Sequence, residues 1–248
     1  MNVWVYTLLS VLAVSLISLV GIFSLLISQK TLEKLTLFLV SFAAGGLFGD
    51  AFIHLLPEAV ENYGFEAKVS LGILGGILTF FILEKFIAWR HCHIPTSDKH
   101  PHPLASMNLI GDGVHNFIDG VIISASFLVS FPLGIATTIA VIFHEIPQEI
   151  GDFGILMHGG FSKTKALAFN LLSSCAAIFG AIFALVFSLQ ISGFIGFLIP
   201  FAVGGFIYIA GSDLIPELHK ETKLSKSILQ LVSFLLGIGV MSALKIIG

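Results

Sequence analysis

Long apolar runs recur along the whole chain, and they constrain its fold more than any other feature of the sequence. A helix needs about 20 mostly apolar residues to cross the core of a bilayer. Such runs lie at about 4–28, 34–58, 69–89, 104–129, 133–158, 164–190, 194–218 and 226–247. They are continuous rather than alternating, so helices are favoured over the strands of a transmembrane barrel. The sequence therefore predicts an all-α membrane protein of eight transmembrane helices, in a single domain over residues 1–248.

The composition agrees with a membrane protein and argues against other classes. Charged residues make up 11% of the chain, whereas a soluble domain has about 25%. The net charge of -3 argues against nucleic acid as a partner. Cys92 and Cys175 lie far apart and predict neither a disulfide framework nor a thiolate metal site. The first apolar run has almost no basic residues before it, so we expect a span rather than a cleaved signal peptide.

Lysine and arginine indicate how the predicted spans are oriented. With eight spans, all but two of the 12 basic residues fall at ends that share one side of the membrane, and the exceptions are Lys68 and Lys245. Basic residues are enriched in cytoplasmic connections. We therefore expect both termini on the non-cytoplasmic side of a cell (inner) membrane, with the lipid bilayer surrounding the domain.

The longest polar connection, residues 90–103, falls on the predicted cytoplasmic side and is rich in histidine. It contains His91, His93, His100 and His102. One interpretation is a solvated loop that happens to contain histidine. The other is a segment that captures or senses a metal ion, because histidine-rich tracts bind metals.

Two distant parts of the chain share a motif. Residues 42–46 (FAAGG) match residues 201–205 (FAVGG) at a separation of 159 positions, from 42 to 201. The same separation relates three later pairs: His54 and Asp213, Pro57 and Pro216, and Glu58 and Glu217. These residues lie in the second and seventh predicted spans, which run in opposite directions. Matching sequence in opposed spans is typical of an inverted repeat, here in a 3+2+3 arrangement that many transporters resemble.

Polar side chains lie in the fourth and fifth predicted spans, where contact with lipid would be costly. The fourth span carries them on one helical face, at i, i+3, i+4 and i+7: Asp112, His115, Asn116 and Asp119. The fifth span carries a second set: His144, Glu145, Gln148, Glu149 and Asp152. A charged group deep in lipid costs about 2.5 kcal/mol or more, so such residues usually face the bundle interior. We therefore expect the two sets to meet near the middle of the membrane.

Imidazole nitrogen and carboxylate oxygen together favour a transition-metal ion. This ligand set suits zinc, iron and manganese better than calcium or magnesium. No cysteine lies on these faces, and a site without thiolates should release metal more readily, as a carrier must. The alternative is that single polar residues only make hydrogen bonds between helices. We expect metal ligation for one set: His115, Asp119, His144 and Glu145.

Polar side chains of the outer spans extend this pattern towards both membrane surfaces. In the second span they follow one another at i, i+4 and i+8: Asp50, His54 and Glu58. In the seventh span they follow at i and i+4: Asp213 and Glu217. The first set suggests an entrance for metal and the second an exit to the cytoplasm. The other interpretation is that the proline beside each glutamate only ends its helix and leaves the acid in solvent.

Two motifs resemble those of the ZIP family of metal transporters. Residues 115–120 (HNFIDG) resemble the HNxxDG motif of the family's fourth helix, and residues 144–152 (HEIPQEIGD) resemble the HExPHExGD motif of the fifth helix in one large subfamily. The predicted spans, their orientation and the histidine-rich connection agree with the family plan, so the resemblance covers nearly the whole chain. It implies import of divalent metal ions towards the cytoplasm by an elevator-like or rocking motion of two helix groups, often in a dimer.

The resemblance also implies a binuclear centre between the fourth and fifth helices. One metal would be held by His115, Asp119, His144 and Gln148. The second would be held or bridged by Asn116, Asp119, Glu145 and Glu149. Gln148 stands where the family motif usually has histidine. Because an amide oxygen is a weaker and harder ligand than imidazole, iron and manganese become stronger candidates beside zinc as the transported substrate, and cadmium is a further candidate.

Other functions have less support in the sequence. An intramembrane zinc protease uses HExxH on one helix, with the glutamate as base. Here the second histidine is replaced by Gln148, and Pro147 interrupts the helix. A metal hydrolase of another kind, a proton or sodium carrier, and a proton-coupled metal exporter are further alternatives, since ligands alone do not reveal the direction of flux. We expect a transporter rather than an enzyme.

Overall fold

The described part of the chain is helical throughout. The computed structural model describes residues 2–26, 28–64, 66–89, 104–158, 160–190 and 193–247, and within these ranges it contains helices and turns but no strand. The first half comprises α1 (Val3–Ile17), the 3-10 helix η1 (Ser18–Leu25), α2 (Gln29–Gly49), the π-helix η2 (Asp50–Leu55), α3 (Leu56–Tyr63) and α4 (Ala67–Trp89). The second half comprises α5 (Leu104–Val129), α6 (Phe131–His158), α7 (Lys163–Ser174), α8 (Ala176–Ser188), α9 (Phe194–Tyr208), the π-helix η3 (Ile209–Leu214), α10 (Ile215–His219) and α11 (Leu224–Ile247). The histidine-rich segment 90–103 lies outside the described residues.

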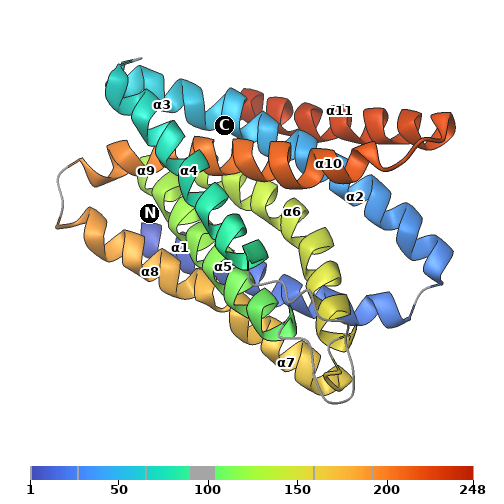
Figure 1. The fold of residues 1–248 in the computed structure, drawn as a ribbon. Coiled ribbons are helices and arrows are strands. Elements are labelled where there is room, and N and C mark those ends of the chain that lie inside the picture. The colour runs from blue at the N-terminus through green and yellow to red at the C-terminus, as the bar shows by residue number, and fades with distance from the viewer. Residues whose placement is uncertain are drawn as a thin grey trace.

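The helices pack in two groups. In the first, here called the central group, α1, η1, α7 and α8 pack around α5 and α6. In the second, the outer group, α2 packs along α11 and α4 packs along α9. Figure 1 shows α5 and α6 crossing the middle of the bundle, with α2, α10 and α11 on one side and α7 and α8 on the other. The groups meet where α2 and η2 contact α6 and where α9 contacts α5.

Glycine allows the closest helix crossings. Each of three helix pairs meets through one glycine on either side: Gly45 and Gly237 for α2 and α11, Gly76 and Gly204 for α4 and α9, and Gly120 and Gly180 for α5 and α8. A Cβ atom added at Gly76 would lie only 2.1 Å from the carbonyl oxygen of Phe201. Small residues at such crossings let backbones approach closely, as is common between membrane helices.

Two π-helices interrupt the long helices of the outer group at equivalent places. η2 begins at Asp50 and η3 begins at Ile209, so they are related by the separation of 159 positions seen in the sequence motif. Each is followed within one turn by a proline, Pro57 or Pro216, at the start of α3 or α10. The helix therefore continues past each proline, contrary to the interpretation in which proline ends it. π-Helical turns are rare and occur frequently at functional sites.

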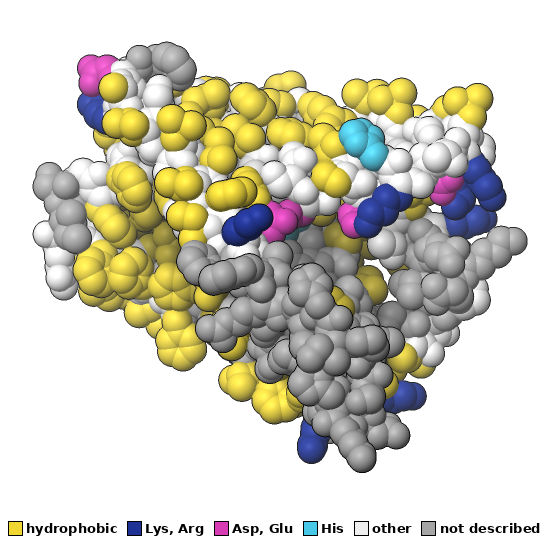
Figure 2. All heavy atoms as spheres, in the orientation of Figure 1, with side chains coloured by type: hydrophobic (Ala, Val, Ile, Leu, Met, Phe, Trp, Pro, Cys, Tyr) yellow, Lys and Arg dark blue, Asp and Glu magenta, His cyan; other side chains and the backbone are white. Residues whose placement is uncertain are grey.

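Among the described residues, six helical segments are long and apolar enough to cross a membrane. They run over Val3–Ile22, Lys34–Tyr63, Ala67–Lys85, Lys163–Ser188, Phe194–His219 and Leu224–Ile246. α5 and α6, of 26 and 28 residues, have the length of a span but carry the polar side chains and fall outside this set. Large apolar side chains are exposed on helices of both groups, among them Leu9, Leu71, Phe179 and Leu235. Figure 2 shows hydrophobic side chains covering much of the described surface on one face, with few charged ones between them.

Two predicted spans are less regular than expected. The run predicted at 164–190 is divided into α7 and α8 at Cys175. The run predicted at 4–28 changes from α-helix to 3-10 helix at Ser18, where the side-chain hydroxyl donates to the carbonyl of Ser15 over 2.8 Å. Near both breaks, Ser15 and Ser174 donate to one another's carbonyl oxygens over 2.9 Å. These side chains tie α1 to α7 within the central group.

Candidate metal centre

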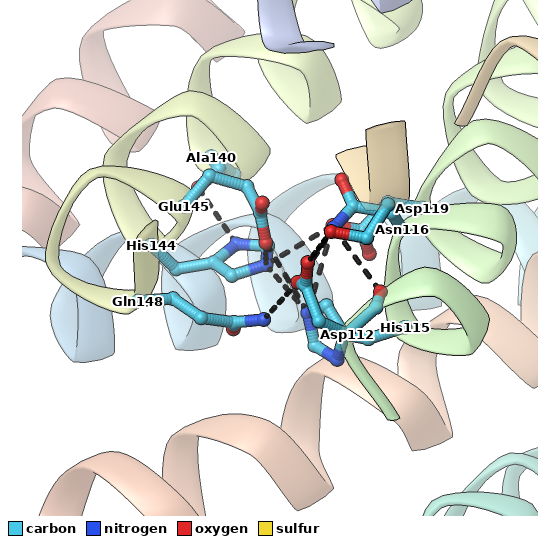
Figure 3. Close-up of polar contacts among 9 residues, drawn as sticks. Asp112, His115, Asn116, Asp119, Ala140, His144, Glu145 and Gln148 are labelled. Atoms are coloured by element: carbon cyan, nitrogen blue, oxygen red, sulfur yellow. Dashed lines mark hydrogen bonds and ion pairs between the residues drawn. The ribbon is translucent and has the colours of Figure 1, made fainter. Parts of the chain in front are cut away.

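Four side chains that can bind metal converge where α5 packs against α6. α5 supplies His115 and Asp119, one turn apart, and α6 supplies the adjacent His144 and Glu145. Each offers one ligand atom, and the four atoms all lie within 4.8 Å of one another. Figure 3 shows the four side chains directed towards the space between the two helices. The structure thus brings together the set that the helical spacing predicted.

The distances between the ligand atoms are those of a tetrahedral site. His115 Nε2 lies 3.2 Å from His144 Nε2, 3.4 Å from Glu145 Oε1 and 3.7 Å from Asp119 Oδ2. His144 Nε2 lies 3.2 Å from Asp119 Oδ2 and 3.3 Å from Glu145 Oε1. Ligands bound at about 2.1 Å to a tetrahedral zinc ion lie about 3.4 Å apart. The cluster therefore has the dimensions that a small divalent cation requires.

The carboxylates of the cluster are buried beside the two imidazoles. Asp119 and Glu145 are both 0% exposed. The polar groups that face their oxygens are the Nε2 atoms of His115 and His144, at 3.2–3.7 Å, and none of these contacts has full hydrogen-bond geometry. A buried, uncompensated carboxylate is strongly unfavourable, and a bound cation offsets this cost. Both carboxylates face the imidazoles of His115 and His144 across the boundary between α5 and α6, an arrangement in which a cation could be shared among the four side chains.

The backbone of α6 sets the tautomer of one imidazole. His144 Nδ1 lies 3.3 Å from the carbonyl oxygen of Ala140, one turn earlier. A carbonyl only accepts, so Nδ1 carries the proton in the neutral ring and Nε2 keeps its lone pair. That lone pair faces the cluster. A metal-binding histidine is usually oriented by such a hydrogen bond from the ring nitrogen that does not bind the metal.

The two predicted amide ligands both contact Asp112. Asn116 Nδ2 donates to Asp112 Oδ1 over 2.8 Å, and Gln148 Nε2 donates to the same oxygen over 3.3 Å. The other oxygen, Asp112 Oδ2, accepts from the hydroxyl of Ser173 over 2.5 Å. The nitrogen of each amide is thus held by Asp112, which leaves the oxygen available to another partner.

A second group of buried carboxylates lies beside the cluster. It is here called the acidic group and consists of Asp112, Glu149 and Asp152, whose ligand atoms lie within 4.8 Å of one another. Glu149 is 0% exposed and accepts from the amide of Asn170 over 2.5 Å. The structure thus places the predicted Glu149 in the acidic group, one turn of α6 away from Glu145.

A polar cavity of about 220 Å³ opens onto the centre from one side. His115 and Gln148 lie at its inner end, and α4, α5, α6, α9 and η3 contribute its walls. Four acidic residues line it: Glu84, Asp112, Asp152 and Asp213. Tyr208 also lines it and donates a hydrogen bond to Glu84. Carboxylates around a cavity favour cations within it.

The predicted outer ligands lie away from the central cluster. His54 is buried, and its Nδ1 lies 3.1 Å from Asp50 Oδ1 within η2. Thr137 of α6 donates to Asp50 Oδ2 over 2.9 Å, which closes this side of the molecule against the central group. Glu58 accepts from the amide of Asn62 over 2.6 Å.

Asp213, by contrast, lines the cavity. Glu217 is exposed and pairs with Lys220. Sequence reasoning did not place Glu84 or Tyr208 at the site. They lie on α4 and α9 and reach the cavity only because these helices cross so closely.

These features define a class: a helical integral membrane protein with a buried centre of histidine and carboxylate ligands. The family model described as ZIP zinc transporter matches residues 1–106 and 91–245. The chain belongs to this family, whose members transport metal ions, and so it is a transporter rather than an enzyme.

The relatives of known name agree with this assignment. The chain is similar to zinc transporter zipt-7.1 of Caenorhabditis briggsae, at 30% identity over 100% of this chain and 80% of the relative. It is similar to zinc transporter ZIP13 of Danio rerio at 32% identity, over 99% of this chain and 88% of the relative. It is also similar to the ZIP13 homologue of Drosophila melanogaster at 32% identity, over 98% and 89% respectively. These similarities extend over nearly the whole chain.

Proposed function

We propose that this protein carries zinc ions across the membrane through the centre between α5 and α6. The observation that carries the proposal is the spacing of the four ligand atoms, which has the edge lengths of a tetrahedral site. The relatives named as zinc transporters support the choice of ion. Ligation requires neutral histidine and ionised carboxylate, so metal binding is coupled to proton release.

A second ion occupies the same centre in this proposal. Its ligands are the oxygens of Asn116, Glu145 and Glu149, with Asp119 as a bridge. Each of these residues is fully buried and has at least one oxygen without a hydrogen-bond donor among the described residues. Three carboxylates together with two imidazoles carry more negative charge than one divalent ion balances, which supports a pair of ions.

In this proposal the metal enters past His54 and Glu58 and leaves on the opposite side, through the cavity lined by Asp213. Two observations support this route. The cavity joins His115 and Gln148 to Asp213, while Asp50 and His54 are buried under α6 by the bond to Thr137. The proposed route is open on the side of the cavity and closed on the side of Asp50, as alternating access requires. We assign the open side to the cytoplasm because the basic residues concentrate there.

An inverted repeat of eight spans supplies the two alternating states. Three features support it: the FAAGG and FAVGG motifs, the π-helices at equivalent positions, and the equivalent glycines Gly45 and Gly204. Each of these glycines lies in a helix pair that joins the two halves of the chain. In this proposal the central group moves against the outer group, and the outer group forms the contact of a homodimer.

Gln148 widens the range of transported ions. Its amide oxygen is harder than imidazole, so iron and manganese compete with zinc more effectively than at an all-histidine site. The histidine-rich segment 90–103 follows α4, whose end lies on the proposed cytoplasmic side. In this proposal it receives metal that leaves the cavity.

Zinc uptake by purified protein in proteoliposomes tests the function. We expect uptake by the wild type, and loss of uptake to the background of empty vesicles for His115→Ala and Asp119→Ala. His219→Ala, which changes an exposed histidine of α10, should keep wild-type uptake. Wild-type uptake by His115→Ala would show that the metal does not pass through this centre.

The alternatives give different results in the same system. An intramembrane peptidase would cleave added peptides in the presence of zinc and would lose this activity in Glu145→Gln. An exporter would drive zinc from the cytoplasmic side of oriented vesicles when a proton gradient is applied. Competition among zinc, iron, manganese and cadmium, with and without that gradient, separates these cases from the proposed import.

A further inference from the structure

We propose that Asp112 is a positioning residue that turns the oxygens of two amide ligands, Asn116 and Gln148, towards the transported cation. This inference rests on the proposed function of the centre, and it concerns a residue that the family motifs do not include. Asp112 lies one turn before Asn116 on α5 and faces Gln148 across the boundary with α6. Figure 3 shows these contacts at the edge of the cluster.

A carboxylate decides the orientation of a neighbouring amide. An ionised carboxylate accepts hydrogen bonds and donates none, whereas an amide has one accepting end and one donating end. Asp112 Oδ1 therefore binds the NH2 group of each amide, at 2.8 Å for Asn116 and 3.3 Å for Gln148. The flipped amide would place oxygen against oxygen. The same contact that holds the nitrogen thus presents the oxygen to the opposite side.

Asp112 is itself held in one orientation. Its side chain is 5% exposed, and its second oxygen accepts from Ser173 of α7 over 2.5 Å. Asn116 also donates to the backbone carbonyl of Asp112 over 3.1 Å. One carboxylate therefore links α5, α6 and α7, and these contacts hold it in place.

Within the described part of the chain, the oxygen of Asn116 is buried without a partner, and Gln148 lies beside His115 in the cavity. Asn116 is 0% exposed, and its Oδ1 has no hydrogen-bond partner among the described residues. Gln148 lines the cavity next to His115. A neutral amide could equally offer its NH2 group to the centre, which would repel a cation. Mutation of a residue that hydrogen-bonds to a metal ligand typically lowers metal affinity about 10–100-fold. Asp112 is such a residue for both amides.

Cobalt(II) and zinc titrations of the purified protein in detergent test the inference, because the visible spectrum of bound cobalt reports the ligand set. We expect Asp112→Ala and Asp112→Ser to lower affinity about 10–100-fold and to alter the cobalt spectrum. Asp112→Asn should restore affinity to within a few fold, since its carbonyl can accept from both amides while its NH2 group donates to Ser173. Thr138→Val, a buried change on α6 whose hydroxyl bonds within its own helix, serves as the control.

The same substitutions are then made in an Asn116→Ala/Gln148→Ala background. If Asp112 acts through the amides, Asp112→Ala has little further effect there. If Asp112 binds the metal directly, or acts only by its charge, the loss persists in that background and Asp112→Asn fails to restore binding. Either result overturns the inference. Wild-type protein that binds neither ion, or binding unaffected by His115→Ala, contradicts the proposed function instead.

Discussion

Gln148 is the residue of the proposed centre at which the chain departs from the family motif, and we expect it to influence which ion is bound. It stands at the inner end of the cavity, where its nitrogen contacts Asp112. A histidine at this position can donate from Nδ1 to the same carboxylate and present Nε2 to the metal. The substitution Gln148→His would therefore replace a hard amide oxygen by an imidazole and keep the hydrogen bond to Asp112.

We predict that Gln148→His shifts transport towards zinc. Imidazole favours zinc over manganese more than an amide oxygen does, so the ratio of zinc to manganese uptake should rise several-fold. The ratio is measured by competition in proteoliposomes. Gln190→His, which places the same side chain at an exposed position after α8, should leave it unchanged. An unaltered ratio in Gln148→His would mean that this position does not set selectivity.

Asp50 gives a second prediction at the scale of the residue. It is fully buried, and Thr137 Oγ1 donates to it across the boundary between the two groups. Thr137→Val removes this donor and leaves a buried carboxylate oxygen unpaired, which costs about 1–3 kcal/mol. We expect a lower melting temperature in detergent for Thr137→Val. The adjacent Thr138→Val, which loses a bond only within α6, should change it less.

The sequence predicts the ligands of the centre better than their orientation. His115 and Asp119 follow from helical spacing, because residues four apart share a face. His144 and Glu145 are adjacent, and they follow from their polarity within an apolar span. The role of Asp112 does not follow, although it lies on the same face as His115. It depends on the rotation of α6 against α5 and on Ser173 of a third helix, and no local pattern encodes either.

At the scale of the element, glycine sets the distance between paired helices. α4 offers a matched comparison, because a Cβ atom at Gly76 would lie 2.1 Å from the Phe201 carbonyl, whereas one at Gly75 would meet nothing within 4 Å. We predict that Gly76→Ala destabilises the protein by about 1–3 kcal/mol or more through overpacking. Gly75→Ala should be neutral or slightly stabilising, because alanine favours helix. Melting temperatures of the two variants that do not differ would contradict this packing.

The long apolar runs predict most helices and few of their irregularities. The bounds of α5 match the predicted span at 104–129. The π-helices, the 3-10 helix η1 and the break at Cys175 were not predicted, because hydropathy is insensitive to a change of helical register. The FAAGG repeat did indicate that two helices are equivalent, and the π-helices lie at equivalent positions within them. An irregularity that recurs in this way is a property of the fold rather than of one segment.

At the scale of the whole molecule, the two helix groups explain why the centre lies where it does. All four clustered ligands lie on α5 and α6, within the central group. The outer group supplies Asp213 to the cavity on one side and buries His54 on the other. A movement of the central group along the outer group would therefore carry the bound metal from one set of outer residues to the other.

A disulfide between the groups tests this movement. Thr137 Oγ1 and Asp50 Oδ2 lie 2.9 Å apart across the boundary, so cysteines at these positions face one another, and loss of free thiol on oxidation shows that the bond has formed. In a background without the two native cysteines, we predict that oxidation of Asp50→Cys/Thr137→Cys abolishes zinc uptake and that a reductant restores it. Ser15→Cys/Ser174→Cys, a pair that joins α1 and α7 within the central group, should transport equally in both states. Because each variant is its own control, uptake that survives cross-linking of the first pair would mean that metal crosses without relative motion of the groups.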